Sequence, residues 1–424
     1  MRVHFVGCEG VSMRRLMELT AKLGHTVSGS DNSIARHNAS NVEGANLVVF
    51  SGAVSSDNPE LVYAYEHNIP LCERGKFLGA IASGFREVVA VAGTHGKTTV
   101  TALTANVLSQ KNPTIHIGAD FPYNDFDCNN ANNDIFVTEA CEYRRSLLEI
   151  RPTLAVILNA ELDHTDCYNS IDEIADIFVE FAQKSNIALY YGDDTILQKR
   201  MPISAYTFGE GERNDFRAIF CAPTNDNCYP FYFYVSGIRL GKVTPRLRGK
   251  HNAINILASL SIGILMGIPF SDLVNTVNNF NGVKRRLEFV GKAFGAKVYT
   301  DYAHHPTEII ATLKALQTRN KLIAVFEPHT FSRTNDLFYD FVHSLSLANE
   351  VILAPIYASR EKSGNISSLD LCKCVHKLVP TRFFDTYEHI NNYLSNTLRP
   401  NDTVVFLGAG SIDGCARMLV NMQN

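Results

Sequence analysis

A lysine flanked by a glycine and two threonines stands in the stretch GTHGKTT, residues 93–99. An apolar run precedes this stretch and a helical pattern follows it, which predicts a strand, a tight turn and a helix. Backbone N–H groups at a helix start attract phosphate, and a lysine ammonium adds mobile positive charge. The Thr98 hydroxyl is also a suitable ligand for Mg²⁺. The stretch therefore predicts a nucleotide phosphate site made of Gly93, Thr94, His95, Gly96, Lys97, Thr98 and Thr99.

Acidic and imidazole side chains follow the next apolar runs of the chain. Glu139 ends the run DIFVTEA, and His164 lies in NAELDHTD, directly after another apolar run. In a doubly wound sheet, residues at the carboxyl ends of parallel strands border the ligand crevice. Imidazole and carboxylate groups at such a place either share a metal ion or orient a nucleophile. Glu139 and His164 are therefore candidate partners of the phosphate site.

The elements that must position these residues alternate between short apolar runs and helical patterns. This alternation predicts an α/β fold with mostly parallel sheets. Residues 213–248 are aromatic, β-branched and rich in turn residues, which predicts a small antiparallel insert. Two joints between a helical segment and a new strand divide the chain into three predicted domains, residues 1–86, 87–282 and 283–424.

Composition excludes several functional classes. The chain has 424 residues, 46% hydrophobic and 19% charged, with a formal net charge of -4, so nothing indicates a nucleic-acid or anionic-membrane surface. No apolar run approaches the roughly 20 residues of a membrane helix. The ten cysteines include no CxxC pair, which argues against a zinc site and a disulfide scaffold. We expect a cytoplasmic protein without nucleic-acid or membrane partners.

Seven stretches occur in a fixed order along most of the chain: GTHGKTT, TEACEYRR, NAELDHTD, RGKHNAINILAS, GVKRRLEFVG, DYAHHPTEI and FEPHTFSRTNDLF. Together they resemble the Mur ligase family. The resemblance implies a Rossmann-like N-terminal domain for a UDP-linked substrate, a P-loop doubly wound central ATPase domain and a Rossmann-like C-terminal domain. It implies ATP and Mg²⁺ as cofactors. In the implied reaction a substrate carboxylate attacks the γ-phosphate of ATP, and an amine then displaces phosphate from the acyl-phosphate.

The resemblance also implies roles for single residues. The implied catalytic residues are Lys97, Glu139, His164 and Arg286. The implied metal ligands are Thr98, Glu139 and His164. Asn255 would approach the adenine, Asp301 would contact the nucleotide, and Arg286 would reach the γ-phosphate and neutralise developing charge. His305 and Arg333 would receive the amino-acid substrate, because an arginine suits its carboxylate.

The first domain departs from the family pattern. Its loop reads GCEGVSMRR, where Glu9 replaces a usual glycine, although Gly7 and Gly10 remain. A Rossmann fold places a ribose-reading acid at the end of the second strand, which is where Asp31 stands. The chain then enters the third strand early, so the domain reads as trimmed. The predicted contacts of the UDP-linked substrate are Gly7, Gly10, Ser12, Ser30, Asp31 and Ser51.

Four functions compete within this resemblance. The stretches TEACEYRR and PHTFSRT favour members that add L-alanine to UDP-N-acetylmuramate in peptidoglycan precursor synthesis, with UDP-N-acetylmuramate, L-alanine and ATP as partners. A second group joins a ready-made peptide to the same sugar during wall recycling. A third alternative is a nucleotide-binding homologue that no longer ligates. A fourth alternative is a ligase that adds glutamate residues to folate. We expect a monomer or weak homodimer.

Overall fold

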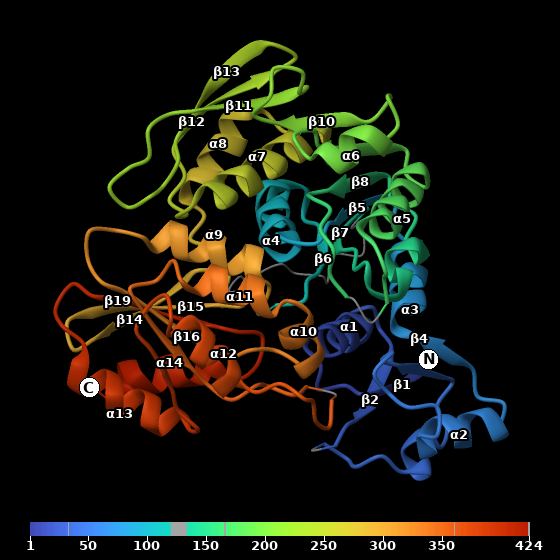
Figure 1. The fold of residues 1–424 in the computed structure, drawn as a ribbon. Coiled ribbons are helices and arrows are strands. Elements are labelled where there is room, and N and C mark those ends of the chain that lie inside the picture. Colours follow the sequence, from blue (N-terminus) through green and yellow to red (C-terminus); the bar gives the residue numbers. More distant parts are fainter. Residues whose placement is uncertain (33, 120–133, 165–166, 360, 423–424) are drawn as a thin grey trace. The chain divides into compact units, whose positions relative to one another are not determined.

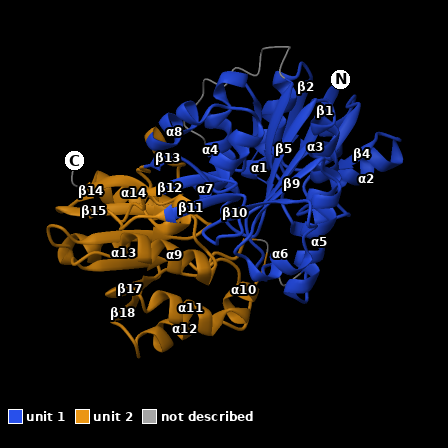
Figure 2. Cartoon of the chain, turned by 90° about the horizontal axis from the view of Figure 1, so that it is seen from above, with its two compact units in different colours: residues 1–219, 232–243, 255–278 blue, residues 220–231, 244–254, 279–424 orange. Residues whose placement is uncertain are grey.

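The computed structural model describes residues 1–32, 34–119, 134–164, 167–359 and 361–422. The described chain divides into two compact units (Figure 2). The first unit comprises Met1–Ile219, Tyr232–Val243 and Asn255–Asn278. The second unit comprises Phe220–Phe231, Thr244–Ile254 and Asn279–Asn424.

The N-terminal part of the first unit is built on a four-stranded sheet in the order β2-β1-β3-β4. All three neighbouring pairs are parallel, as expected for a Rossmann-like domain. The strands are β1 (Arg2–Val6), β2 (Thr26–Ser30), β3 (Leu47–Phe50) and β4 (Leu71–Glu73), and the helices are α1 (Val11–Lys22), α2 (Pro59–Glu66) and α3 (Arg74–Ala82). Between β2 and β3 the described chain forms only the short 3₁₀ helix η1 (Ala39–Val42), in agreement with a shortened connection.

A nine-stranded sheet follows, in the order β13-β12-β11-β10-β9-β8-β5-β7-β6 (Figure 1). Its strands are β5 (Glu87–Ala92), β6 (Thr114–His116), β7 (Ile135–Glu139), β8 (Leu154–Ile157), β9 (Ile187–Tyr191), β10 (Tyr206–Gly209), β11 (Phe216–Phe220), β12 (Phe231–Val235) and β13 (Ile238–Val243). The pairs from β6 to β11 are parallel. The central strand β5 is buried at every position after its first, which is typical of a parallel strand covered on both faces.

The helices that accompany this sheet are α4 (Lys97–Val107), η2 (Ser109–Lys111), η3 (Tyr143–Glu149), α5 (Ile171–Gln183), α6 (Thr195–Arg200), α7 (Lys250–Leu265) and α8 (Phe270–Asn279). Helix α5 shows why such segments fold here. Its apolar residues recur at helical spacing, so Ile174, Phe178 and Phe181 share a buried face while the acidic residues of its first turn stay outside.

The predicted insert at residues 213–248 is not a sheet of its own. Strands β11 to β13 extend the nine-stranded sheet, and β11 joins it through a parallel pair with β10. Strands β12 and β13 are linked by Ser236 and Gly237, whose φ angles of 47° and 79° are those of a tight antiparallel hairpin turn. The antiparallel prediction therefore describes the hairpin, and the parallel β10–β11 pair is what attaches it.

The second unit contains a six-stranded sheet in the order β14-β15-β19-β16-β17-β18, parallel except for β14 with β15. Its strands are β14 (Glu288–Ala293), β15 (Ala296–Asp301), β16 (Leu322–Phe326), β17 (Glu350–Leu353), β18 (Thr381–Phe383) and β19 (Thr403–Leu407). Its helices are α9 (Pro306–Leu316), α10 (Phe331–Asp336), α11 (Phe338–Leu345), α12 (Ser368–Val375), α13 (Tyr387–Thr397) and α14 (Ile412–Asn421). Alternate residues of β16 enter two separate cores, so both faces of the sheet are covered.

The α/β fold with parallel-dominated sheets is confirmed. The domain boundaries at residues 86 and 282 stay predictions, since the first two sheets fall within one compact unit. Among the described residues, no helix is long and apolar enough to span a bilayer.

Candidate active site

The glycine-flanked turn lies between β5 and α4, and α4 begins at Lys97 itself. Gly93 and Gly96 have φ angles of 131° and 85°, a region that other residues enter only with strain. A Cβ atom on Gly93 would also lie 3.0 Å from the Leu158 backbone nitrogen. The two glycines therefore allow the chain to turn tightly and to present the start of α4, as the sequence predicts.

The segment after β8 holds this phosphate loop in place through hydrogen bonds from Asn159 and Glu161. The Asn159 side chain accepts a hydrogen bond from His95 N at 2.8 Å and donates one to His95 O at 3.0 Å. The Thr94 hydroxyl donates to Glu161 O at 3.1 Å and accepts from Glu161 N at 2.9 Å. These paired bonds hold Thr94 and His95 in place without using the N–H groups at the start of α4.

Lys97 turns back toward its own loop. Its Nζ donates to Gly93 O at 2.5 Å and to Thr94 O at 3.1 Å. It also forms an ion pair with Glu142, 2.9 Å from Oε2, and the other oxygen of this carboxylate lies 3.2 Å from His164 Nε2. Lys97, Glu142 and His164 thus form one connected cluster.

The charges of this cluster support each other. Burial alone would raise the pKa of Glu142, but the Lys97 charge and the His164 hydrogen bond lower it below its usual value. Burial alone would lower the pKa of Lys97, but the Glu142 charge raises it above its usual value. Both groups are therefore charged at neutral pH.

Glu142 is a site residue that the sequence reasoning missed. It lies in TEACEYRR, three positions after the predicted Glu139, at the start of η3. Its backbone oxygen accepts hydrogen bonds from Arg145 N and from the Tyr168 hydroxyl. These bonds hold the Glu142 backbone at the start of the turn, and its side chain contacts Lys97.

Glu139 lies at the carboxyl end of β7, as predicted, and its Oε1 accepts a hydrogen bond from Gly118 N at 3.0 Å. Thr98 is buried in the first turn of α4. A hydroxyl and a carboxylate are oxygen ligands of the kind that Mg²⁺ prefers, whereas imidazole suits other metals better. Among the described residues, no group of three ligand atoms within 4.8 Å contains Glu139 or His164. Thr98 and Glu139 therefore carry oxygen donors suited to Mg²⁺, His164 Nε2 lies 3.2 Å from Glu142 Oε1, and the metal-ligand roles of all three stay predictions.

Asn255 lies on α7 and packs against the phosphate loop. A Cβ atom on Gly96 would approach Asn255 Oδ1 to 2.8 Å, so only glycine leaves room for this side chain. The contact places Asn255 beside the predicted nucleotide site, and its approach to the adenine stays a prediction.

The glycine loop of the first domain joins β1 to α1. Gly7, with φ of 81°, donates its N–H to Ser30 O at 2.9 Å, and Gly10 caps α1. Asp31 accepts a hydrogen bond from Glu9 N at 2.9 Å, so the acidic residue that replaces a glycine is held through its backbone. The loop keeps its strand-to-helix geometry.

Three hydroxyl residues surround this loop in different ways. Ser12 accepts a hydrogen bond from Arg74 at 3.1 Å, and Ser51 follows β3 and donates its N–H to Val6 O. Ser30 is buried and donates its hydroxyl to Glu60 at 2.6 Å. The Ser30 hydroxyl thus bonds to Glu60, while the Ser30 backbone oxygen accepts the hydrogen bond from Gly7 N in the loop. Contacts of Ser12, Ser30 and Ser51 with a substrate stay predictions.

Glu60 is a second residue that the sequence reasoning missed. Its carboxylate is fully buried and also accepts a hydrogen bond from Asn41 at 2.5 Å. His37 Nδ1 lies 2.9 Å and His4 Nε2 3.8 Å from it. Burial acts to raise the pKa of Glu60, but these hydrogen bonds lower it to about 2.

In the second unit, Arg286 and Asp301 are neighbours. The Arg286 guanidinium lies 4.9 Å from the centre of the Tyr302 ring. Asp301 is buried and accepts hydrogen bonds from Leu287 N and from the Thr312 hydroxyl. Burial raises the pKa of Asp301 to about 6, and the Arg286 charge opposes this rise. Their roles toward a nucleotide stay predictions.

The predicted amino-acid residues differ in position. His305 caps α9, and its Nδ1 accepts a hydrogen bond from Thr307 N at 3.4 Å. Arg333 lies on α10 with Nη1 3.3 Å from His329 Nδ1. The ring of His304, the residue before His305, lies 5.6 Å from that of His329. The structure thus groups His304 and His329 with Arg333, while His305 caps α9, and contacts of His305 and Arg333 with an amino acid stay predictions.

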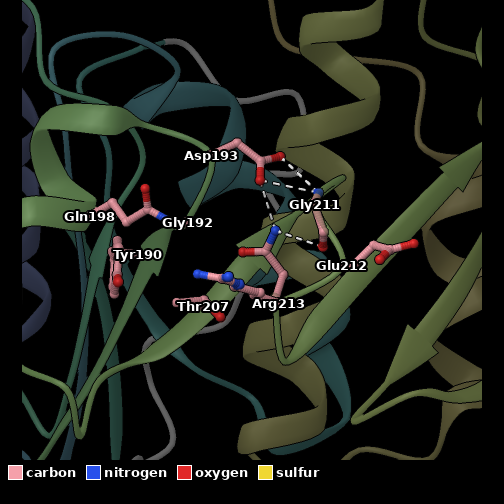
Figure 3. Close-up of a pocket in the computed structure, with 9 residues that line it drawn as sticks. Tyr190, Gly192, Asp193, Gln198, Thr207, Gly211, Glu212 and Arg213 are labelled. Carbon is pink, nitrogen blue, oxygen red and sulfur yellow. Dashed lines mark hydrogen bonds between the residues drawn. The ribbon is translucent and has the colours of Figure 1, made fainter.

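A polar pocket of about 460 Å³ also lies in the first unit, lined by Tyr190, Gly192, Asp193, Gln198, Thr207, Gly211, Glu212, Arg213 and Asn214 (Figure 3). Asp193 accepts hydrogen bonds from Gly211 N and from the Asn214 amide, which fixes the turn that forms one wall. None of the predicted site residues lines this pocket.

Comparison with known proteins agrees with the motif order. The model of the Mur ligase family catalytic domain matches residues 2–86, that of the Mur ligase middle domain residues 91–263, and that of the Mur ligase glutamate ligase domain residues 285–410. The fold and the phosphate loop define the same class, and the chain belongs to the Mur ligase family.

Individual relatives are more specific. The chain is 35% identical to the UDP-N-acetylmuramate–L-alanine ligase of Clostridium botulinum over 447 residues, which covers 99% of this chain and 97% of the relative. The enzyme of the same name from Clostridium acetobutylicum is also 35% identical, with the same coverage.

Solved structures share the fold. The UDP-N-acetylmuramate-alanine ligase MurC from Thermotoga maritima has a TM-score of 0.85 at 24% identity, covering 100% of this chain and 99% of that one. A murein peptide ligase from Psychrobacter arcticus has a TM-score of 0.71 at 21% identity, covering 99% and 98%. MurF from Thermotoga maritima in complex with ADP has a TM-score of 0.64 at 18% identity, covering 90% and 89%.

Proposed function

We propose that this protein joins L-alanine to UDP-N-acetylmuramate at the expense of ATP, in peptidoglycan precursor synthesis. The observation that carries the proposal is the intact phosphate loop around Lys97, in a chain that matches alanine-adding ligases along its whole length. The products are the alanyl amide, ADP and phosphate. A cytoplasmic location and a monomeric or weakly dimeric state are part of this proposal.

The first half-reaction is a phosphoryl transfer. The lactyl carboxylate of the sugar attacks the γ-phosphorus of ATP, ADP leaves, and an acyl-phosphate forms. Such a transfer needs positioning and charge neutralisation more than covalent help from the protein. Lys97 and the N–H groups at the start of α4 supply positive charge for the phosphates. A Mg²⁺ ion held by Thr98 and Glu139 would neutralise further phosphate charge.

The second half-reaction forms the amide. The neutral amine of L-alanine attacks the acyl carbon, phosphate leaves with its bonding electron pair, and the nitrogen gives up one proton to the released phosphate or to solvent. Arg333 carries a guanidinium that suits the carboxylate of a single amino acid. His329 lies 3.3 Å from that guanidinium and limits its orientation. We propose that this group binds alanine.

Substrate-dependent phosphate release tests the proposal. Release is expected only when ATP, UDP-N-acetylmuramate and L-alanine are all present, and a tripeptide is not expected to replace alanine. Release with the tripeptide but not with alanine would assign the protein to the murein peptide ligases. ADP binding without phosphate release in the presence of either L-alanine or the tripeptide would indicate a homologue that has lost ligation.

A further inference from the structure

The ammonium group of Lys97 has no hydrogen left for a phosphate. An ammonium has three N–H donors. Two are directed at Gly93 O and Thr94 O, at 2.5 and 3.1 Å. The third is directed at the Glu142 carboxylate, whose oxygens lie 2.9 and 3.2 Å away. A phosphate oxygen can therefore bind Lys97 only if one of these acceptors gives way.

The three acceptors are not equally able to leave. Gly93 O and Thr94 O belong to the loop that Asn159 and Glu161 hold in place, so their release would open the loop. Glu142 reaches Lys97 with a side chain from a different segment, and a side chain can change rotamer. The same carboxylate already has a second partner in His164 at 3.2 Å. Glu142 is therefore the acceptor that can separate from Lys97 and still keep one hydrogen-bonding partner.

We propose that Glu142 is a positioning residue that holds Lys97 until a nucleotide phosphate displaces it. This inference rests on the proposed function only in that the phosphate loop binds ATP or ADP. Glu142 would then keep its bond to His164 while Lys97 turns to the phosphate. The exchange requires no proton transfer, because Lys97 and Glu142 are both charged before and after it.

The exchange has a cost in affinity. A nucleotide must compete with a carboxylate that is only 3% exposed, and the released carboxylate stays close to the incoming negative charge. The electrostatic repulsion between the Glu142 carboxylate and the phosphates is greatest when no metal ion neutralises the phosphates. Glu142 should therefore weaken the binding of metal-free ADP more than that of ADP with Mg²⁺.

Calorimetric titration with ADP tests this directly. The unmodified chain and Glu142→Gln are titrated with ADP in EDTA and again with Mg²⁺. Glu142→Gln should bind metal-free ADP about tenfold more tightly, because the amide has the same shape but no charge to compete. The gain should be smaller with Mg²⁺.

Glu180→Gln is the matched control. It also removes one negative charge, but Glu180 is 41% exposed and pairs with Arg145 instead of Lys97. Its affinity for ADP should equal that of the unmodified chain. Equal or weaker binding of metal-free ADP by Glu142→Gln overturns the inference and leaves the proposed function standing, whereas no ADP binding by the unmodified chain overturns both.

A crystal structure of the unmodified chain with ADP gives an answer even if Glu142→Gln folds poorly. The inference predicts that Lys97 Nζ lies on a phosphate oxygen and more than about 4 Å from both Glu142 oxygens. An intact Lys97–Glu142 ion pair beside bound ADP would contradict it.

Discussion

At the scale of single residues, Lys97 has a structural task in addition to its role toward phosphate. Its side chain is 15% exposed, and it neutralises a Glu142 carboxylate that is 3% exposed. A lysine at a phosphate loop is ordinarily expected to be dispensable for folding. Here its loss leaves a buried negative charge without its cation, although His164 remains beside it.

Lys97→Met should therefore lower both activity and stability. We expect no measurable ligation, and a loss of about 3 kcal/mol in the free energy of unfolding, because breaking a buried ion pair leaves one charge uncompensated. Urea unfolding measures the loss. Adding Glu142→Gln to Lys97→Met should restore most of the stability and none of the activity. A double variant as unstable as Lys97→Met would refute this explanation.

Glu60 makes a pH-dependent contribution to stability. Its pKa is lowered from 4.5 to about 2 in the folded chain, so the folded state holds the proton less tightly than the unfolded state. The stabilisation is complete above pH 4.5 and is lost as the pH falls toward 2. The shift corresponds to about 3 kcal/mol.

Glu60→Gln should remove this pH dependence. Between pH 5 and pH 2.5 the unfolding free energy of the unmodified chain should fall more steeply than that of the variant, as measured by urea unfolding at each pH. The other acidic residues are the same in both proteins, so the difference reports Glu60. Parallel pH profiles for the two chains would contradict the assignment.

At the scale of elements, the turn of η3 presents Glu142 to Lys97. Arg144 and Arg145 within it have φ angles of 50° and 59°, which residues with a side chain adopt at a cost. The Tyr168 hydroxyl accepts a hydrogen bond from Arg145 N at 3.1 Å and donates one to Glu142 O. Tyr168 is buried, so this hydroxyl is part of what keeps the turn in shape.

Tyr168→Phe should loosen the turn. We expect a loss of about 1 kcal/mol in unfolding free energy, because Arg145 N and Glu142 O each lose their hydrogen bond to the buried Tyr168 hydroxyl. The affinity for metal-free ADP should rise as well, since Glu142 is held less firmly against Lys97. Thermal unfolding and calorimetry measure the two effects. If neither quantity changes, Tyr168 has no part in placing Glu142.

The sequence predicts the local elements better than the contacts between them. The strand, glycine turn and helix around Lys97 follow from residues that are adjacent in the chain, and they are found as predicted. Glu142 was missed because it lies beyond the strand end, at the start of a turn with two arginines in a left-handed conformation, and arginine carries no signal for that conformation. Glu60 reads as an ordinary acidic residue in the first turn of α2, and only the packing of β1, β2 and α2 buries it.

At the scale of the whole molecule, the proposal assigns ATP and L-alanine to different parts of the chain. The phosphate loop lies in the first unit, and Arg333 lies in the second. The proposal assigns the nucleotide phosphates to the former and the alanine carboxylate to the latter. Substitutions in the two units should therefore affect different kinetic constants.

Arg333→Ala should raise the KM for L-alanine at least about tenfold and leave the KM for ATP within about twofold, because one charged contact to one substrate is lost. Arg333→Lys should recover part of the alanine affinity, since the charge returns without the planar guanidinium. Steady-state phosphate release measures both constants. An equal rise in both KM values would argue that Arg333 supports the fold instead of the substrate.

Isotope transfer tests the central claim most directly. UDP-N-acetylmuramate carrying ¹⁸O in both oxygens of its lactyl carboxylate is incubated with the protein, ATP, Mg²⁺ and L-alanine. The masses of the products are then measured by mass spectrometry. The account predicts one ¹⁸O in the released phosphate and one in the new alanyl amide, because a carboxylate oxygen attacks the γ-phosphorus and leaves with it. Unlabelled phosphate, or a sugar that gains no alanine, would contradict it.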